Sequence, residues 1–146
     1  MITINIANQT LTYQGLVYSI SSAANGTGEI EGSFCTPLGK FKIAEKIGQD
    51  LAPGSVLVAR VPTGEVYSQK LSDQQPNRDW ILSRILWLDG VEPHNKNTKQ
   101  RYIYIHGSPD EFCQGVAGSK GCIRMKNSDI IKIFNQVKTG DEVIIQ

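Results

Sequence analysis

The sequence has few cysteines and histidines, and those present are not spaced as metal ligands usually are. Its three cysteines, Cys35, Cys113 and Cys122, form no CxxC pair, and its two histidines, His94 and His106, lie far apart. A disulfide framework and a zinc ribbon are therefore not expected. The sequence predicts no metal site and no cofactor.

Strong charge and long apolar runs are also missing. The formal net charge is +1, with no basic stripe, so we expect neither a nucleic acid nor a membrane surface as partner. No apolar run is long enough to span a bilayer. Ile2, Ile4 and Ile6 alternate with polar residues, which predicts a strand and not a signal peptide. We expect a cytoplasmic protein, or a periplasmic one if a leader has been removed.

The length and the patterning predict one mostly-β domain over residues 1–146. Residues 80–88 are nearly all apolar, and periodicity alone does not separate helix from strand there. Residues 72–79 are polar and are expected to form a loop. Strands are expected at 2–6, 11–13, 16–20, 41–43, 55–61, 65–69, 101–105 and 143–145.

About one α-helix is expected, near the C-terminus. Asn127 or Ser128 is a candidate N-cap, and Asp129 would lie favourably in the first turn. Gly140 is the expected stop. The apolar stripe of this helix consists of Ile130, Ile131, Phe134 and Val137.

The main chemical signal is a histidine at the end of a strand followed by a cysteine in a loop of small residues. Beside His106, Cys122 could ionise as a thiolate–imidazolium pair, and His106 could then protonate a leaving amine. The amides of Gly121 and Cys122 could bind an oxyanion, and the Gly107 carbonyl could orient the imidazole. The alternative is structural, because many buried cysteines are inert.

Four segments carry a resemblance to a known family. They are Thr36-Pro37-x-Gly39-x-Phe41, Arg84 to Leu88, Tyr104 to Gly107, and Ser119-Lys120-Gly121-Cys122-Ile123-Arg124-Met125. Together they resemble the L,D-transpeptidase catalytic domain, also called the YkuD-type domain, over nearly the whole chain. The resemblance implies a β-sandwich-like fold and a cysteine enzyme of peptidoglycan.

By motif position, the resemblance implies that Cys122 is the nucleophile and His106 the base. It also implies that Gly107 orients His106 and that Gly121 belongs to the oxyanion hole. One departure is Lys120, which stands where the family usually has a second histidine. Lys120 could tune the thiolate, meet a substrate carboxylate, or be a solvated loop lysine.

Six residues are candidates for substrate binding. Arg124 shares a face with the thiol if the chain is extended there, and Arg84 needs a partner inside its apolar run, either a substrate carboxylate or an internal ion pair. Trp87 could line a pocket or pack in the core. The alternation at 102–106 turns Tyr104 and His106 toward a cleft and Ile103 and Ile105 toward the core. Ser119 and Lys120 complete the set.

The resemblance implies attack on the bond between diaminopimelate and the terminal D-alanine of a peptidoglycan tetrapeptide stem or muropeptide, through a thioester. Water as acceptor makes an L,D-carboxypeptidase of muropeptide recycling, which we favour because no export signal is evident. An amine acceptor makes a crosslinking or D-amino-acid-exchanging L,D-transpeptidase, and a non-catalytic muropeptide-binding domain is the second alternative. Carbapenem-type inhibitors are expected to bind.

Overall fold

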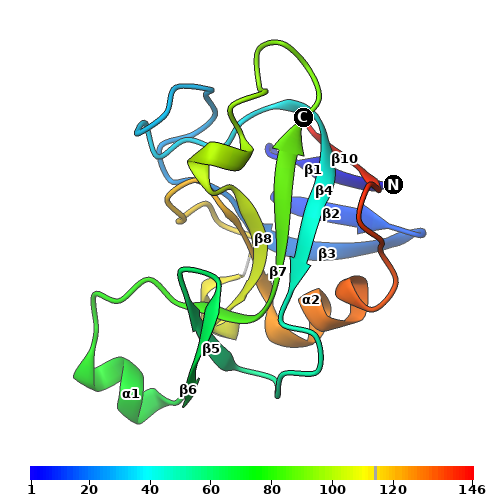
Figure 1. The fold of residues 1–146 in the computed structure, drawn as a ribbon. Coiled ribbons are helices and arrows are strands. Elements are labelled where there is room, and N and C mark those ends of the chain that lie inside the picture. The colour runs from blue at the N-terminus through cyan, green and yellow to red at the C-terminus, as the bar shows by residue number, and fades with distance from the viewer. Residues whose placement is uncertain (114) are drawn as a thin grey trace.

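A single ten-stranded sheet organises the computed structural model, which describes residues 1–113 and 115–146 (Figure 1). The strand order is β4-β10-β1-β2-β3-β9-β8-β7-β5-β6. Two α-helices, α1 (Gln69–Gln74) and α2 (Asn127–Phe134), accompany it. The strands are β1 (Ile2–Asn5), β2 (Thr10–Tyr13), β3 (Leu16–Ser21), β4 (Gly39–Ile47), β5 (Ser55–Val58), β6 (Val61–Val66), β7 (Ile81–Gly90), β8 (Tyr104–Ser108), β9 (Ile123–Lys126) and β10 (Glu142–Ile145).

The sheet closes on itself, because β4, the first strand in this order, also pairs with β7. In β4, Phe41 pairs with Val143 of β10 and also with Gly90 of β7. Because the same residue pairs on both sides, β10 and β7 lie at opposite edges of β4, and eight strands enclose a common interior. Figure 1 shows β1, β2 and β3 crossing behind β4, β7 and β8. This arrangement confirms the expected mostly-β, sandwich-like class.

The interior holds one large apolar core. Strand alternation supplies it, since Ile2 and Ile4 of β1 are almost fully buried while the residues between them are not. Helix α2 closes one side with Ile130, Ile133 and Phe134, packing against β7, β8 and β9. Ile131, which we placed in the apolar stripe, is only partly buried, and Ile133 takes its place.

The helix α2 begins as expected but is capped differently. Its N-cap is Lys126, with no side-chain capping hydrogen bond. Asn127 instead donates its side-chain N–H to the Ser108 carbonyl at 3.0 Å and accepts from Ser83. The residue that we expected to cap the helix therefore ties its first turn to β7 and β8. Gly140, which we expected to stop the helix, lies beyond its end: α2 ends at Phe134 with Asn135 as C-cap, and Gly140 has φ +95° in the turn before β10.

The middle of the chain forms an arm beside the main body. Strands β5 and β6 form a hairpin on the first residues of β7, and α1 follows (Figure 1). A small core of Val56, Trp80 and Leu82 holds the arm. The predicted strand 55–61 is thus interrupted by a turn at 59–60. The predicted strand 65–69 is wrong beyond Val66, where β6 ends, because Ser68 caps helix α1 and Gln69 begins it.

Helix α1 was predicted in part as a loop, and that prediction was wrong. Ser68 caps the helix by accepting from the Leu71 N–H at 3.1 Å. The helix buries no residue, so its sequence carries no apolar stripe to reveal it. Residues 80–88 resolve as strand β7, and residues 99–101 form a 3₁₀ turn before β8. In the described part of the chain, no helix is long and apolar enough to cross a membrane.

The β5–β6 turn is strained, which gives a stability prediction. Ala59 has φ +46° and Arg60 φ +66°, values that a two-residue hairpin turn needs but that a Cβ disfavours. Asn tolerates this region, so Ala59→Asn should raise the free energy of unfolding by about 0.5–1 kcal/mol. Urea denaturation measures it. Ala117→Asn, at an exposed site without positive φ, should change little, and equal effects of the two changes would contradict the strain argument.

Candidate functional site

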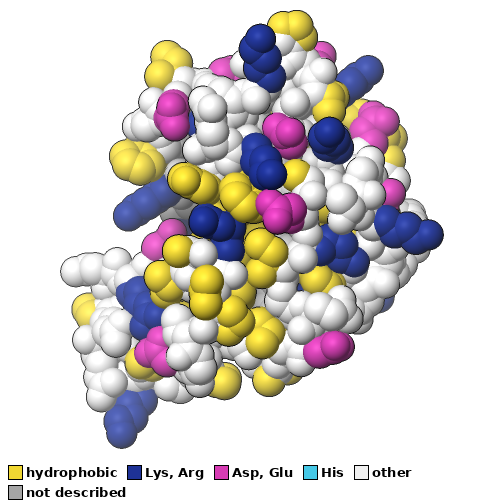
Figure 2. All heavy atoms as spheres, in the orientation of Figure 1, with side chains coloured by type: hydrophobic (Ala, Val, Ile, Leu, Met, Phe, Trp, Pro, Cys, Tyr) yellow, Lys and Arg dark blue, Asp and Glu magenta, His cyan; other side chains and the backbone are white. Residues whose placement is uncertain are grey.

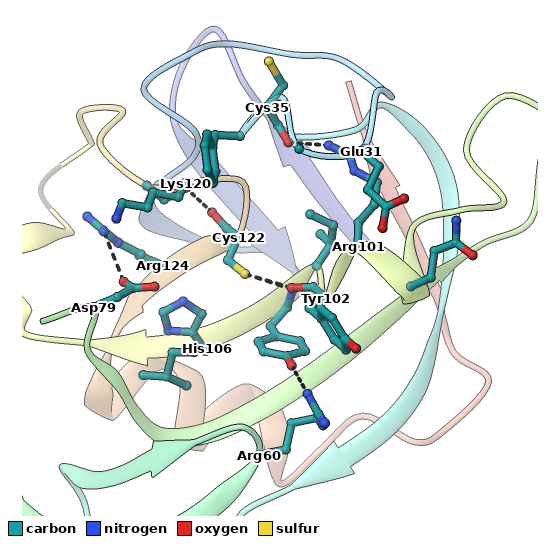
Figure 3. Close-up of a pocket in the computed structure, with 17 residues that line it drawn as sticks. Glu31, Cys35, Arg60, Asp79, Arg101, Tyr102, His106, Lys120, Cys122 and Arg124 are labelled. Carbon is teal, nitrogen blue, oxygen red and sulfur yellow. Dashed lines mark hydrogen bonds and ion pairs between the residues drawn. The ribbon is translucent and has the colours of Figure 1, made fainter.

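Cys122 and His106 open onto one cavity of about 520 Å³ (Figure 3). Cys122 stands directly before β9, and His106 is the third residue of β8. These strands pair in parallel with His106 opposite Arg124, so the side chains of His106 and Arg124 lie on one face of the sheet. Cys122, two residues before Arg124, lies on the same face. The pairing thus brings His106 of one predicted motif together with Cys122 and Arg124 of another.

The loop before Cys122 is shaped by Ser119. Its buried hydroxyl accepts the Gly121 N–H at 3.2 Å and donates to the Cys122 carbonyl. Its own N–H donates to the Ser22 carbonyl at 2.9 Å. Ser119 borders the cavity, but its hydroxyl is engaged within the loop. The Ser119 hydroxyl therefore fixes the loop that carries Cys122.

Thr36 holds the same loop, although it lies far from it in the sequence. Its fully buried hydroxyl accepts the Ala23 N–H at 3.0 Å and donates to the Gly121 carbonyl at 2.9 Å. One side chain thus satisfies two buried backbone groups that are 98 residues apart in the sequence. Through this contact the Thr36 motif supports the Cys122 motif, although the two are far apart in the sequence.

Gly121 needs to be glycine. Its φ is +127°, and a Cβ there would lie 3.2 Å from the Cys35 carbonyl oxygen and 3.3 Å from Ile103 Cδ1. Both the backbone conformation and the tight space disfavour a side chain. The Gly121 N–H points to Ser119, so it does not face the cavity as we expected of an oxyanion donor. Among the described residues, no hydrogen bond from the Cys122 N–H is found.

His106 is buried and held in one orientation. Its Nδ1 lies 2.6 Å from the Gly107 carbonyl oxygen. A carbonyl only accepts, so Nδ1 carries the proton, and in the neutral ring the Nε2 lone pair is available as a base. A Cβ at Gly107 would lie 2.3 Å from the Leu82 carbonyl oxygen, so only glycine lets β8 approach β7 here.

Backbone groups of Tyr102, just before β8, and of Tyr104, at its start, hydrogen-bond the Cys122 thiol. Its S–H donates to the Tyr102 carbonyl and its sulfur accepts the Tyr104 N–H, both at 3.3 Å. Among the described residues, no hydrogen bond joins it to His106. Figure 3 shows the imidazole beside the thiol, both facing the cavity. A rotation of the thiol away from Tyr102 is thus the step that would bring it to Nε2.

Burial disfavours the charged form of both reactive groups in this arrangement. Burial raises the pKa of the Cys122 thiol to about 12, although the Tyr104 N–H favours the thiolate. Burial lowers the pKa of His106, against the opposing effect of the Gly107 carbonyl. The thiolate–imidazolium pair that we expected in the resting enzyme is therefore not favoured. The geometry suits an imidazole base that removes the thiol proton during attack.

Arg124 reaches the cavity but already has a partner. Its Nη2 lies 3.6 Å from Asp79 Oδ1, and its guanidinium lies 5.9 Å from the Phe112 ring centre. The Asp79 carboxylate disfavours a Cys122 thiolate, and the Arg124 guanidinium favours one. Lys120 also lines the cavity and is exposed.

Two other candidates lie outside this cavity. Arg84 is buried and donates to the Leu51 and Ser83 carbonyls at 2.8 and 2.7 Å, with its guanidinium near the Phe134 ring. It binds carbonyls, not the acidic partner that we considered. Trp87 lines a second, neighbouring cavity and donates its indole N–H to the Lys99 carbonyl at 3.1 Å.

The sequence reasoning missed several charged residues of the site. Arg60, Arg101, Asp79 and Glu31 all line the main cavity. Figure 2 shows Lys and Arg side chains among hydrophobic ones across the middle of this face. Arg60 carried no signal, because we predicted residues 55–61 as one strand. Within the described residues, no group of three or more His, Cys, Asp or Glu side chains is placed to hold a metal ion.

Comparison with known families agrees with the fold and the motif order. The family model of the L,D-transpeptidase catalytic domain matches residues 1–145. The chain belongs to the L,D-transpeptidase catalytic-domain family. Two Bacillus subtilis relatives are "Putative L,D-transpeptidase YkuD", 36% identical over 65% of this chain, and "Putative L,D-transpeptidase YqjB", 29% identical over 73%. The matches span 50% and 58% of those relatives, about half of the length of each.

Solved structures of this family share the fold. An L,D-transpeptidase from Mycobacterium smegmatis is 19% identical, with a TM-score of 0.59 over 99% of this chain and 57% of that one. L,D-transpeptidase 3 from Mycobacterium tuberculosis, solved with a faropenem-derived adduct, is 16% identical, with the same TM-score over 99% and 59% of the two chains. At these identities the likeness establishes the architecture of the L,D-transpeptidase domain.

The Thr36 bridge gives a prediction about the nucleophile loop. Thr36→Val keeps the shape but leaves the Ala23 N–H and the Gly121 carbonyl unpaired, which costs about 1–3 kcal/mol for each group. We expect a lower free energy of unfolding in urea and slower alkylation or turnover at Cys122. Thr36→Ser, which keeps the hydroxyl, should preserve most of both. If Val and Ser behave alike, the hydroxyl does not hold the loop.

The neutral resting pair predicts the pH dependence of thiol alkylation. In a Cys35→Ser, Cys113→Ala background, iodoacetamide reports on Cys122 alone. Because the thiol pKa is raised, its alkylation rate should keep rising beyond pH 8.5, where an ordinary thiol titrates. Since His106 has a lowered pKa, it stays a competent base somewhat below pH 6.5, so turnover should fall only below that pH.

His106→Gln serves as the matched variant for this measurement. It should slow turnover by about a hundredfold or more, the usual effect of losing an acid–base group, while changing the alkylation profile little. A plateau of fast alkylation near neutral pH that disappears in His106→Gln would show a resting ion pair and overturn the interpretation.

Proposed function

We propose that this domain is a cysteine-dependent acyl-transfer enzyme that cleaves the L,D bond between diaminopimelate and terminal D-alanine in peptidoglycan stems or muropeptides. One observation carries the proposal: the Gly107 carbonyl fixes the His106 tautomer so that Nε2 can act as a base in the cavity that holds Cys122. Membership of the L,D-transpeptidase family supports the choice of bond.

The reaction begins with proton transfer from the Cys122 thiol to His106 Nε2 as the sulfur attacks the scissile carbonyl carbon. The Cys122 N–H is the proposed donor to the oxyanion, since the Gly121 N–H serves Ser119. The intermediate collapses, the C–N bond breaks, and His106 returns its proton to the leaving D-alanine amine. A thioester between Cys122 and the diaminopimelate carbonyl remains.

Water is the acceptor that we propose for this thioester. His106 removes a proton from water, the hydroxyl adds to the carbonyl, and Cys122 leaves as the thiol with the proton returned. The charge of the cavity supports this choice: Arg60, Arg101, Lys120 and Arg124 face only two carboxylates, and one of these, Asp79, pairs with Arg124. Such a lining disfavours a cationic amine acceptor.

Transfer to an amine is the second candidate, and Glu31 favours it. This acidic side chain lines the cavity and could attract the ammonium group of a second stem or of a free D-amino acid. The donor half of the reaction would be the same. The acceptor alone then separates an L,D-transpeptidase from an L,D-carboxypeptidase.

Carbapenem-type β-lactams are proposed as covalent inhibitors. L,D-transpeptidase 3 from Mycobacterium tuberculosis was solved with a faropenem-derived adduct, and a second structural neighbour was solved in complex with imipenem. Another neighbour was solved as an avibactam carbamoyl enzyme. In this chain, the attacking group would be Cys122, with ring opening replacing departure of an amine.

Product analysis tests the proposed reaction. With a purified disaccharide-tetrapeptide, mass spectrometry should find disaccharide-tripeptide and free D-alanine as main products, with crosslinked dimers minor even at high donor concentration. Cys122→Ala should abolish both this release and labelling by a carbapenem, whereas Cys35→Ala and Cys113→Ala should retain both. Predominant dimers would favour transpeptidation, and turnover by Cys122→Ala would exclude the cysteine mechanism.

A further inference from the structure

Arg60 stands at the wall of the catalytic cavity without an assigned role. It is carried on the two-residue turn between β5 and β6, where both residues have positive φ. Strained conformations of this kind persist where the surrounding structure requires them, often at functional sites. We propose that Arg60 is a specificity-determining residue that binds a carboxylate of the acyl-donor peptide. The proposal rests on the function proposed above and deepens it.

Three aromatic side chains hold the Arg60 guanidinium in place. Its Nη1 donates to the Tyr104 hydroxyl at 3.0 Å. Its Cζ lies 4.8 Å from the Trp87 ring centre and 5.1 Å from that of Tyr102. Stacking and a hydrogen bond together fix the plane of the guanidinium before any ligand arrives. A preorganised fork loses little entropy when it binds a carboxylate.

Most of the hydrogen-bonding capacity of Arg60 remains available. A guanidinium has five N–H donors, and within the described residues Arg60 makes one side-chain hydrogen bond and no ion pair. The other arginines of the cavity are engaged: Arg124 with Asp79, and Arg101 with the Gly28 and Cys35 carbonyls. Arg60 is therefore the arginine of this cavity that is best able to take an added carboxylate in a two-pronged contact.

The residues that hold Arg60 also hold the nucleophile. Tyr104 accepts from Arg60 through its hydroxyl and donates to Cys122 Sγ through its N–H. The Tyr102 ring contacts Arg60, and its carbonyl accepts the thiol proton. A carboxylate bound at Arg60 would thus lie at a fixed position relative to the Cys122 thiol, because residues 102–104 contact both. In Figure 3, Arg60 and Arg124 lie on different sides of Cys122.

The donor peptide has two carboxylates that could meet this fork. One is the α-carboxylate of the terminal D-alanine, and the other is the side-chain carboxylate of diaminopimelate. Their chemistry is shared, so the two sources are separated by amidating one at a time. The amide keeps the size of the group and removes its charge.

Binding by an unreactive enzyme is the direct test. In a Cys122→Ala background, calorimetry would compare the free tetrapeptide with its two mono-amides. Amidation of the recognised carboxylate should weaken binding about ten- to hundredfold, the usual effect of losing a charge-assisted contact. Adding Arg60→Met should weaken binding of the free acid by a similar factor and abolish the discrimination. Arg60→Lys should restore part of it.

Arg78→Met is the matched control. Arg78 also stacks on a tryptophan of the arm, Trp80, and pairs with Glu65, but it does not line the cavity. It should leave affinity and discrimination unchanged. The proposal is overturned if neither amide binds more weakly than the acid, if no peptide binds, or if Arg60→Met lowers all three affinities equally.

The test also separates this inference from the proposed reaction. If the enzyme with Cys122 intact releases no D-alanine, yet Arg60 discriminates acid from amide in the Cys122→Ala background, the recognition role stands and the reaction is wrong. If Arg60→Met does not fold, judged by its thermal melting, Arg60→Lys takes its place: it should narrow the difference in affinity between acid and amide, and an unchanged difference would overturn the proposal.

Discussion

The parallel pairing of β8 with β9 is the constraint on which the site depends. Its register sets His106 opposite Arg124 and brings Cys122, directly before β9, to the same face. A slip of one residue would turn these side chains to the opposite face. Parallel pairing requires a long connection between the two strands, and residues 119–122 at its end form the loop that carries Cys122. Thr36 and Ser119 then hold that loop with hydroxyls that bond only backbone groups.

The same packing that positions the site also sets its chemistry. Placing Cys122 and His106 in a region of low solvent access disfavours both charged forms. Under the proposed function, such a site would not store a reactive thiolate. The Tyr102 carbonyl and the Tyr104 N–H hydrogen-bond the thiol, and an incoming substrate would have to compete with those two hydrogen bonds. Reactivity would then arise with the substrate in place, which would limit side reactions of the thiol.

The sequence predicted those parts of the molecule that depend on local pattern. Alternation at 102–106 correctly turned Ile103 and Ile105 inward. Helix α1 was not predicted because none of its residues is fully buried. Arg60 was not predicted because a strained turn interrupts an apolar run there. Arg84 shows a different limit: its pattern indicated a buried cation that needs a partner, but only the fold reveals that backbone carbonyls are that partner.

The arm of β5, β6 and α1 joins the proposed recognition residue, Arg60, to the rest of the site. Val56, Trp80 and Leu82 form a small core of the arm, and Leu57 of β5 packs with Ile85 and Tyr104 in a further cluster that Cys122 contacts. A polar link runs from Arg60 through Tyr104 to Cys122. Under the proposed function, exchanging the Arg60 side chain would alter which charged group is accepted, whereas a change at Leu57 would also disturb the packing beside Cys122. The two tasks differ in their physical demands, because proton transfer needs a rigid pair while substrate choice needs only one well-placed charge.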